Sequence, residues 1–322
     1  MLKLNRRPSI TRLILPALLC VGGLICGLSL TASAEAPAPL ASEATVEVDI
    51  TKTELGVTRV RISKQNKSSA EHVGYFLGLL HLALQKTVES HGPYRVEMSG
   101  ELSSQSRSLA RLRDGDDIDV FWTMTSRERE GVLQAIKFPL IKGLMGQRVF
   151  LIRKGEQSRF DGKHDISSLQ RLRAGQGSQW PDTDVLRANK IPVIISTTYE
   201  LLFPMLKGGR FDYFPRGLHE VSSELDHHPE LVLEKGLMLE YHAPMYFFVR
   251  PGNDRLADRL LEGLQRAQKD GSFDHYFNNH PVTSKVFERV GRAQRRVIHL
   301  HNSLINQEHD KPLDQQGQQG PI

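Results

Sequence analysis

Three hydroxyl side chains stand close together where an expected strand gives way to an expected short helix. Thr123 ends the strand that the pattern predicts over residues 118–123, and Thr125 and Ser126 precede the helix. Hydroxyls and free backbone N–H groups at a helix start can hold an anion, and the helix dipole assists. The same side chains can also simply cap the helix. We therefore expect Thr123, Thr125 and Ser126 to contact a ligand, to cap the helix, or to do both.

A second group of such residues lies in the glycine-rich stretch over residues 175–180. Gly177 permits close approach of the backbone to a bound molecule. Ser178 and Gln179 add polar groups, and Trp180 either stacks on a ligand or packs under the loop. A tight turn without a ligand is the alternative interpretation. We count Gly177, Ser178, Gln179 and Trp180 as candidate binding residues.

Chemistry that depends on a thiol or a metal is not indicated. Both cysteines, Cys20 and Cys26, lie within the first 34 residues, so the rest of the chain has neither a disulfide nor a cysteine nucleophile. The 13 histidines form no recognisable metal-binding motif, and no nucleophile elbow or phosphate-binding loop is present. Glu101, Asp182 and Glu220 are conceivable acids or bases, but no motif marks them. We expect no catalytic residue, no metal and no cofactor.

Strands and amphipathic helices alternate from about residue 57, which predicts an α/β fold with mixed sheets flanked by helices. This alternation occurs once before Gly146 and once after it, and near this glycine the chain is expected to pass from one α/β unit to the next. A length of 322 residues also suggests about two domains. The expected strands cover residues 57–62, 94–98, 118–123, 146–153, 192–196, 211–214 and 245–249. The expected helices cover residues 71–88, 104–113, 182–188, 199–206, 254–269 and 282–304.

The first 34 residues have the three parts of an export signal. Basic residues precede an apolar run over residues 13–30, and Ala32-Ser33-Ala34 offers the small residues that a signal peptidase needs. A membrane anchor is the alternative, because the run is close to spanning length. We expect export to the periplasm with cleavage after Ala34, a flexible tether over residues 35–54, and a disordered tail over residues 307–322.

The formal net charge of +5 resides mainly in this leader. The leader holds four basic residues and no acidic one, which leaves 38 basic and 37 acidic side chains in the remainder. No basic face or stripe remains to attract nucleic acid. The sequence therefore indicates that nucleic acid is not a partner.

Three motifs, in their order along the chain, resemble type II periplasmic solute-binding proteins, closest to the family 3 group of amino-acid receptors of ABC importers. Residues 246–264 followed by Asp270-Gly-Ser-Phe are similar to the returning strand, terminal helix and aspartate-glycine turn of that family. Residues 112–129, with Gly115, Asp119, Thr125 and Arg129, resemble its "G-x-x-D…T-x-x-R" motif. Residues 175–180 are similar to the turn that opens its second lobe.

The resemblance implies a two-lobed clamshell that closes on its ligand by a hinge motion. Lobe 1 would comprise residues 55–145 and 245–306, and lobe 2 residues 146–244, with crossings near Gly146 and Pro244. Ligands of such α/β sheets bind beyond the carboxyl ends of strands, here between the lobes. The implied partners are a small-molecule solute and a membrane permease or sensor domain, and the protein is expected to be a monomer.

The resemblance also assigns roles to single residues. Arg129 matches the arginine that grips the ligand carboxylate, a task that suits the paired donors of a guanidinium. The family places an aspartate for the ligand ammonium near Arg216, and an arginine facing the cleft there would favour an anionic solute. The alternative is that Arg216 points to solvent or pairs with Glu220. Tyr75 lines the cleft mouth or belongs to the core.

Our leading hypothesis is a non-enzymatic periplasmic protein that captures a small polar, anionic solute by lobe closure for an ABC-type importer or a sensor. The second hypothesis is a secreted enzyme on the same fold, similar to cyclohexadienyl dehydratases, since fold alone does not decide function. The third is an orphan domain that binds a protein partner.

Overall fold

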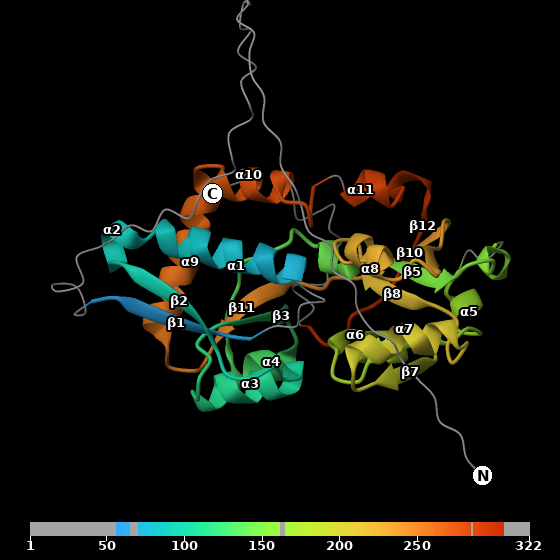
Figure 1. Ribbon diagram of the computed structural model, residues 1–322, viewed down its shortest axis with the longest axis horizontal. Helices are drawn as coiled ribbons and strands as arrows, with labels where there is room; N and C mark the ends of the chain where they lie inside the picture. The colour runs from blue at the N-terminus through green and yellow to red at the C-terminus, as the bar shows by residue number, and fades with distance from the viewer. Residues whose placement is uncertain (1–55, 65–69, 162–164, 285, 306–322) are drawn as a thin grey trace, which may run out of the picture. The chain divides into compact units, whose positions relative to one another are not determined.

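The computed structural model describes residues 56–64, 70–161, 165–284 and 286–305 (Figure 1). The expectations about the export signal over residues 1–34, the tether over residues 35–54 and the tail over residues 307–322 lie outside this part. Within it the chain forms the expected α/β architecture of mixed sheets flanked by helices. No helix in the described segments is long and apolar enough to cross a membrane.

The first group of strands forms two small sheets (Figure 1). β1 (Thr58–Ser63) pairs in parallel with β2 (Tyr94–Ser99), and a bridge joins Ile62 of β1 to Val120. The second sheet is antiparallel and has the order β3-β11-β4, formed by β3 (Phe121–Met124), β11 (Met245–Val249) and β4 (Gln134–Ile136). β11 is thus a late segment of the chain that returns to strands formed much earlier.

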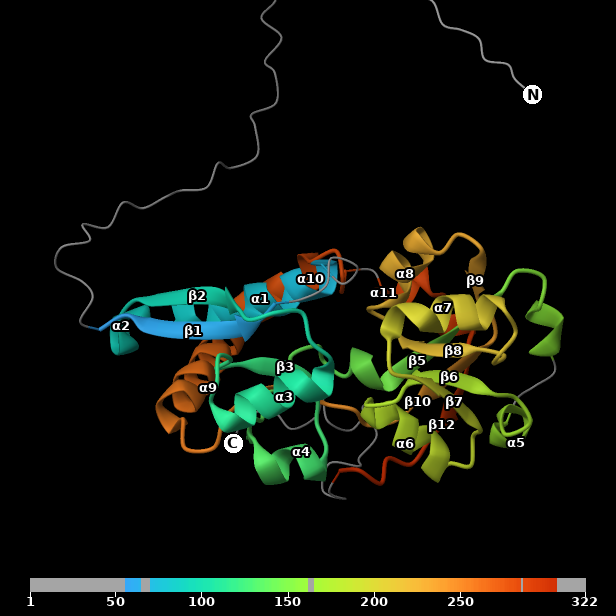
Figure 2. The same cartoon turned by 60° about the horizontal axis from the view of Figure 1, so that its bottom comes forward.

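Helices cover these sheets because their apolar residues recur on one face. α1 (Ala70–Gln85) buries Phe76, Leu80 and Leu84 and packs against α9 (Asp254–Lys269), which in turn contacts α10 (Ser272–Asn279) (Figure 2). The remaining helices of this group are α2 (Val88–His91), α3 (Gln105–Asp114) and α4 (Arg127–Val132).

The second group has a sheet of order β12-β10-β5-β8, with β9 also paired to β5, and a parallel pair β6-β7. Every residue of β5 except the last is buried, which fits a strand covered on both faces. The strands are β5 (Gln147–Arg153), β6 (Ala174–Gly177), β7 (Val193–Ser196), β8 (Phe214–Gly217), β9 (Leu231–Leu233), β10 (Leu237–Glu240) and β12 (Arg296–His299). The helices are α5 (Ile166–Leu169), α6 (Pro181–Ala188), α7 (Tyr199–Lys207) and α8 (Val221–His227).

The chain passes from the first group of strands to the second between β4 and β5, and returns between β10 and β11. Gly146 lies at the first passage, where an added Cβ would stand 1.9 Å from the carbonyl oxygen of Tyr241. The two passages therefore run in contact, and glycine is required for that contact.

The prediction of one helix over residues 282–304 is wrong. Among the described residues of this range, the structure has only the short helix α11 (Val286–Arg289) and a 3-10 turn, followed by β12. Gly291 interrupts the helix with a φ of 61°, and the residues beyond it alternate in burial, with Ile298 and Leu300 inside. β12 pairs in parallel with β10. Residues 296–299 consequently belong to the second group of strands, which corrects the assignment of all of 245–306 to lobe 1.

Two further boundaries differ from expectation. The strand expected over residues 211–214 is β8, over Phe214–Gly217, so Arg216 is a strand residue rather than one that follows a strand. Residues 175–177, expected as part of a turn, belong to β6 (Ala174–Gly177), and the turn begins at Ser178. In both cases short runs rich in glycine or proline carry too little periodic signal to set strand ends.

Candidate functional site

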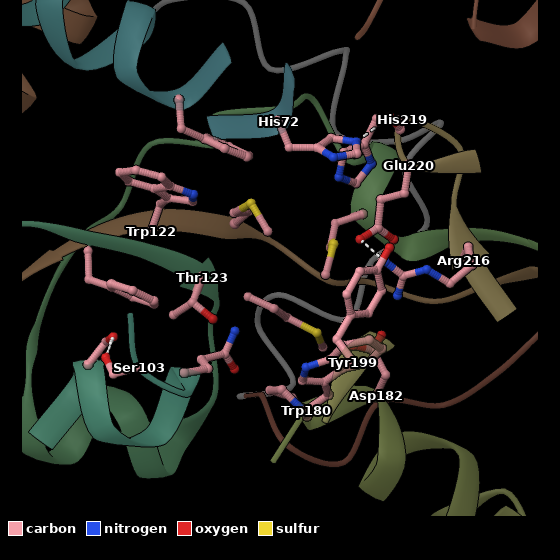
Figure 3. A pocket seen from close by; sticks show the side chains of 18 residues that line it. His72, Ser103, Trp122, Thr123, Trp180, Asp182, Tyr199, Arg216, His219 and Glu220 are labelled. Carbon is pink, nitrogen blue, oxygen red and sulfur yellow. Dashed lines mark hydrogen bonds and ion pairs between the residues drawn. The ribbon is translucent and has the colours of Figure 1, made fainter. Parts of the chain in front are cut away.

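A cavity of about 270 Å³ is lined by side chains from both groups of strands (Figure 3). The first group contributes His72, Phe76, Ser103, Gln105, Ser108, Phe121, Trp122, Thr123, Met124 and Met245. The second group and the passage before it contribute Met145, Trp180, Pro181, Asp182, Tyr199, Arg216, His219 and Glu220. The volume is close to the lower end of the range for small-molecule sites, about 300 Å³. The cavity therefore suits a small solute.

The side of the cavity built from the first group is mainly apolar. Trp122 of β3 stacks on Phe76 of α1, with ring centroids 5.6 Å apart and 22° between the planes. Met124 and Met245 stand opposite each other on β3 and β11, so their side chains project on the same face. We call Phe76, Phe121, Trp122, Met124 and Met245 the apolar wall.

The opposite side is charged, and Arg216 lies at its centre (Figure 3). Its Nε donates to Oε1 of Glu224 at 2.7 Å, and its Nη2 donates to Oε1 of Glu220 at 2.6 Å. The guanidinium also lies over aromatic rings, 4.8 Å from the ring centroid of Trp180 and 4.9 Å from that of Phe214. Arg216 is thus held by two carboxylates and by cation–π contacts.

Arg148 of β5 forms a second layer behind Arg216. Its Nη2 donates to Oδ1 of Asp182 at 2.5 Å and its Nη1 to Oε2 of Glu220 at 3.1 Å. The hydroxyl of Tyr241 donates to the same oxygen of Asp182. We call Asp182, Glu220, Glu224, Arg148 and Arg216 the charged cluster.

The pKa values of the two glutamates move in opposite directions. Burial opposes ionisation of Glu220, but the charge of Arg216, together with His219 and Arg148, outweighs it and lowers the pKa of Glu220. Burial, reinforced by the negative charge of Glu220, raises the pKa of Glu224 despite its bond to Arg216. Burial is thus the main reason why Glu224 is disfavoured as an anion, and the charge of Glu220 adds to it.

Two histidines lie at one edge of the charged cluster (Figure 3). Nε2 of His72 is 2.7 Å from the carbonyl oxygen of His219. Nδ1 of His219 is buried and has no hydrogen-bond partner among the described residues. Burial lowers the pKa of His219 to about 3, so its ring is neutral at physiological pH. Nowhere in the described segments do three His, Cys, Asp or Glu side chains gather as metal ligands.

Arg129 lies one layer behind the cavity rather than on its wall. Its Nη1 donates to Oγ1 of Thr123 and to the carbonyl of Met124, both at 2.6 Å. Its Nη2 donates to Oε1 of Gln105 at 2.6 Å and to the carbonyl of Gln179 at 3.3 Å. Burial lowers the pKa of Arg129 to about 10. Thr123 and Gln105 line the cavity, so they stand between Arg129 and a bound solute.

The other two hydroxyl residues serve α4 in this structure. Ser126 is the N-cap, and its Oγ accepts from the backbone N–H of Arg129 at 3.2 Å. The hydroxyl of Thr125 donates to Oε1 of Glu130 at 2.6 Å. Of the three hydroxyl candidates, Thr123 alone lines the cavity.

The glycine-rich candidates lie around Trp180, which lines the cavity. An added Cβ on Gly177 would stand 2.5 Å from the ring of Trp180, so this glycine makes room for the indole. Ser178 and Gln179 line an adjoining hollow of about 430 Å³, which shares Trp180 with the cavity. Oγ of Ser178 is buried and lacks a partner within the part of the chain that the structure describes.

For the last two candidates, the structure shows the alternative that was considered beside ligand contact. Tyr75 is fully buried in the core, where its hydroxyl donates to the carbonyl of Leu140 at 2.8 Å, and it does not line the cavity. Arg216 does line the cavity but pairs with Glu220, the alternative considered for it, and with Glu224. An arginine already neutralised by two carboxylates gives no reason to expect an anionic solute.

Sequence reasoning missed several residues of the site. His72, Phe76 and Met145 carried no signal of their own, because histidine and apolar residues at helical spacing are ordinary components of a core. Arg148 directly precedes the apolar residues 149–152 of an expected strand, and a charged residue at such a position is a sign in the sequence that it has a specific partner. The spacing of Arg216, Glu220 and Glu224 by four residues was another.

Solved structures of amino-acid-binding proteins have the same fold. A Salmonella typhimurium periplasmic binding protein with high arginine specificity matches with a TM-score of 0.54 and 14% identity, over 69% of this chain and 99% of that one. The Streptococcus pneumoniae ABC transporter substrate-binding protein AbpA, bound to L-arginine, matches with a TM-score of 0.52 and 14% identity over 74% and 96%. An ancestral amino-acid-binding protein that is a precursor of cyclohexadienyl dehydratase matches with a TM-score of 0.50 and 14% identity over 70% and 95%.

No family sequence profile matches the chain, and no curated protein matches it in sequence. The expected two-lobed fold of type II periplasmic binding proteins is confirmed, while at these identities the likeness establishes the fold alone.

Proposed function

We propose that this protein is the solute-binding component of an ABC-type importer or of a sensor, and that it captures a small amino-acid-like solute in the cavity. The observation that carries the proposal is the cavity itself. It is lined from both groups of strands, as a site that forms by lobe closure requires, and it combines an apolar wall with a few fixed polar groups. The fold is shared with proteins whose bound ligand is arginine.

The state of the two acidic side chains that line the cavity, Asp182 and Glu220, favours binding over catalysis. A general acid or base needs a pKa near the working pH. Arg148 and Arg216 hold Glu220 as an anion and lower its pKa, and Asp182 is held by Arg148 and Tyr241. These groups are fixed in ion pairs, which suits recognition of a ligand more than proton transfer.

The leader over residues 1–34 supports a place in the periplasm, where a permease or the outer domain of a sensor would receive the loaded protein. A two-lobed receptor of this kind works as a monomer, because one chain supplies both walls of its cavity.

A thermal-shift screen of the protein purified from the periplasm tests the proposal. Amino acids, amines and carboxylic acids are the panel, and a solute at about 100 times its Kd should stabilise the fold by ~2.7 kcal/mol, a shift of a few degrees. Trp122→Leu on the apolar wall should abolish the shift, whereas Phe287→Leu, an exposed residue of α11, should leave it unchanged. A panel without any stabilising solute would contradict the proposal.

A further inference from the structure

We propose that residues 300–304 form a strap that ties the two groups of strands together and limits how far they can open. The strap lies beyond Asp270-Gly-Ser-Phe, the last stretch of the chain that resembles the receptor family. The inference goes beyond the proposed function, because it concerns a motion of the chain and holds for any solute that the cavity takes.

One end of the strap is anchored in the second group of strands. β12 pairs in parallel with β10, and the backbone N–H of Leu300 continues this pairing by donating to the carbonyl of Glu240 at 2.8 Å. Asn189, at the end of α6, holds the next residue, His301. Its Nδ2 donates to the carbonyl of His301 at 2.8 Å, and its Oδ1 accepts from the N–H of His301 at 3.2 Å. This end is therefore fixed to both β10 and α6.

The other end of the strap is bound to the first group, at the start of α4. The backbone N–H of Arg127 donates to the carbonyl of Leu304 at 2.8 Å, and Nη2 of Arg127 donates to the carbonyl of Ser303 at 2.7 Å. A single residue, Asn302, separates the bonds of His301 to the second group from the bond of Ser303 to the first. One residue spans at most about 3.6 Å, so this link cannot lengthen much when the groups move apart.

The strap runs beside the passage between β10 and β11. Nδ2 of Asn302 donates to the carbonyl of His242 in that passage at 2.8 Å. The carbonyl of Pro244, in the same passage, accepts from the N–H of Thr125 at 2.9 Å. A hinge motion has to bend the passages, because they join the two groups. Figure 2 shows the red C-terminal segment leading from β12 toward α4, where it adds a third segment to the hinge.

Leu304 lies where the two groups meet. It lines a hollow of about 280 Å³ together with residues 126–129 of the first group and with residues 178–181 and Asp184 of the second. Trp180 lines both this hollow and the cavity. Opening of the cavity would widen the hollow and pull Leu304 away from α4. Release of the strap is therefore coupled to access of a solute to the cavity.

Arg127→Pro releases the strap while leaving α4 able to form. Arg127 is the first residue of α4 after the N-cap Ser126, a position that favours proline because the N–H there makes no bond within the helix. Ser126 already has the extended backbone that precedes a proline, with φ of −155° and ψ of 159°. The variant loses both bonds to the strap. Glu128→Ala, at the next residue, is the control that keeps them.

Double electron–electron resonance between two spin labels measures the opening in the protein purified from the periplasm, without any solute. Both native cysteines lie in the leader over residues 1–34. The labels are attached at Arg113→Cys on α3 of the first group and Arg187→Cys on α6 of the second, two exposed positions. The protein with an intact strap should give one narrow distribution of distances.

Arg127→Pro should increase the population at longer distances about tenfold, because two hydrogen bonds that hold the groups together are lost. Glu128→Ala should keep the narrow distribution. A broad distribution with the strap intact, or an unchanged one in Arg127→Pro, would overturn the inference, whatever solute the thermal-shift screen finds. Should Arg127→Pro fail to fold, Asn302→Ala takes its place, and an unchanged distribution in that variant would overturn the inference equally.

Discussion

His219 shows at the scale of one residue how the charged cluster affects stability. Its ring is buried with Nδ1 unpartnered within the described residues, and burial lowers its pKa to about 3, against about 6.5 in an unfolded chain. As the pH falls through 6.5, the His219 ring therefore binds a proton in the unfolded state but stays neutral in the folded state. The contribution of His219 to the free energy of unfolding is therefore fully present above pH 6.5 and is lost progressively below it.

We predict that the free energy of unfolding falls by up to about 1.4 kcal/mol per pH unit below pH 6.5 through His219 alone. Urea unfolding at several pH values between 6.5 and 5 measures this slope, before most carboxylates titrate. His219→Asn should flatten the slope, and His227→Asn, an exposed histidine on α8, should not. Parallel slopes in the wild-type and His219→Asn proteins would show that His219 is accessible to protons.

Arg216 gives a second prediction at this scale. Arg216→Met leaves Glu220 and Glu224 buried without their shared cation, which should cost about 3–5 kcal/mol of stability. Adding Glu224→Gln to that variant should recover part of the loss, because Glu220 keeps its ion pair with Arg148 whereas Glu224 loses its bond to a cation. Urea unfolding of the single and double variants is the measurement. A loss below about 1 kcal/mol would mean that Arg216 does not hold the cluster together.

At the scale of elements, α1 and α9 touch so closely that one glycine is required between them. A Cβ added at Gly263 of α9 would stand 2.0 Å from the carbonyl oxygen of Ala83 in α1. Both helices bury their apolar faces in this contact, so separating them would disturb the core beneath. α1 also carries His72 and Phe76 of the cavity, and its position therefore matters for the site.

Gly263→Ala should destabilise the protein by about 1–3 kcal/mol, because backbone atoms cannot yield without moving a helix. Gly74→Ala is its matched control, since Gly74 is an exposed residue of α1 with open space around its Cβ position. That substitution should stabilise by up to about 1 kcal/mol through helix propensity. Thermal unfolding of the two variants gives the comparison, and equal effects would refute the close contact.

The elements also show which structural features were predictable. The long helices α1 and α9 were predictable because their apolar residues recur with the period of a helix. The strands β5 and β11 were predictable because they are continuous apolar runs. β8 and β12 were misjudged because four-residue strands are fixed by pairing partners distant in sequence. Thr123, Trp180 and Arg216 were foreseen at the cavity from motif position, whereas the roles of Asp182 and Glu224 depend on contacts that only the fold creates.

At the scale of the whole described chain, the C-terminal segment joins the two groups of strands. β12 belongs to the second group, and beyond it the carbonyl of Leu304 accepts from the backbone N–H of Arg127 at 2.8 Å, at the start of α4. Asn302 lies between these two connections and is 1% exposed. Its Nδ2 donates to the carbonyl of His242 at 2.8 Å, and its Oδ1 accepts from the N–H of Leu304 at 2.9 Å.

Asn302→Ala should therefore cost about 1–3 kcal/mol of stability, because it removes both hydrogen bonds that the buried side chain makes to part-buried backbone groups. Hydrogen exchange should show faster exchange of the Arg127 amide in this variant, since the segment that accepts its bond is released. Asn279→Ala, at the exposed end of α10, serves as a control with little effect. Unchanged exchange at Arg127 would show that the segment is held without Asn302.

The chain contains two tryptophans, Trp122 and Trp180, and both line the cavity. A titration of intrinsic tryptophan fluorescence therefore reports on this cavity directly. We predict a saturable change in emission on addition of a solute that the thermal-shift screen identifies. Solute binding detected by calorimetry without any change in tryptophan emission would place the ligand elsewhere and contradict the assignment of the cavity as the binding site.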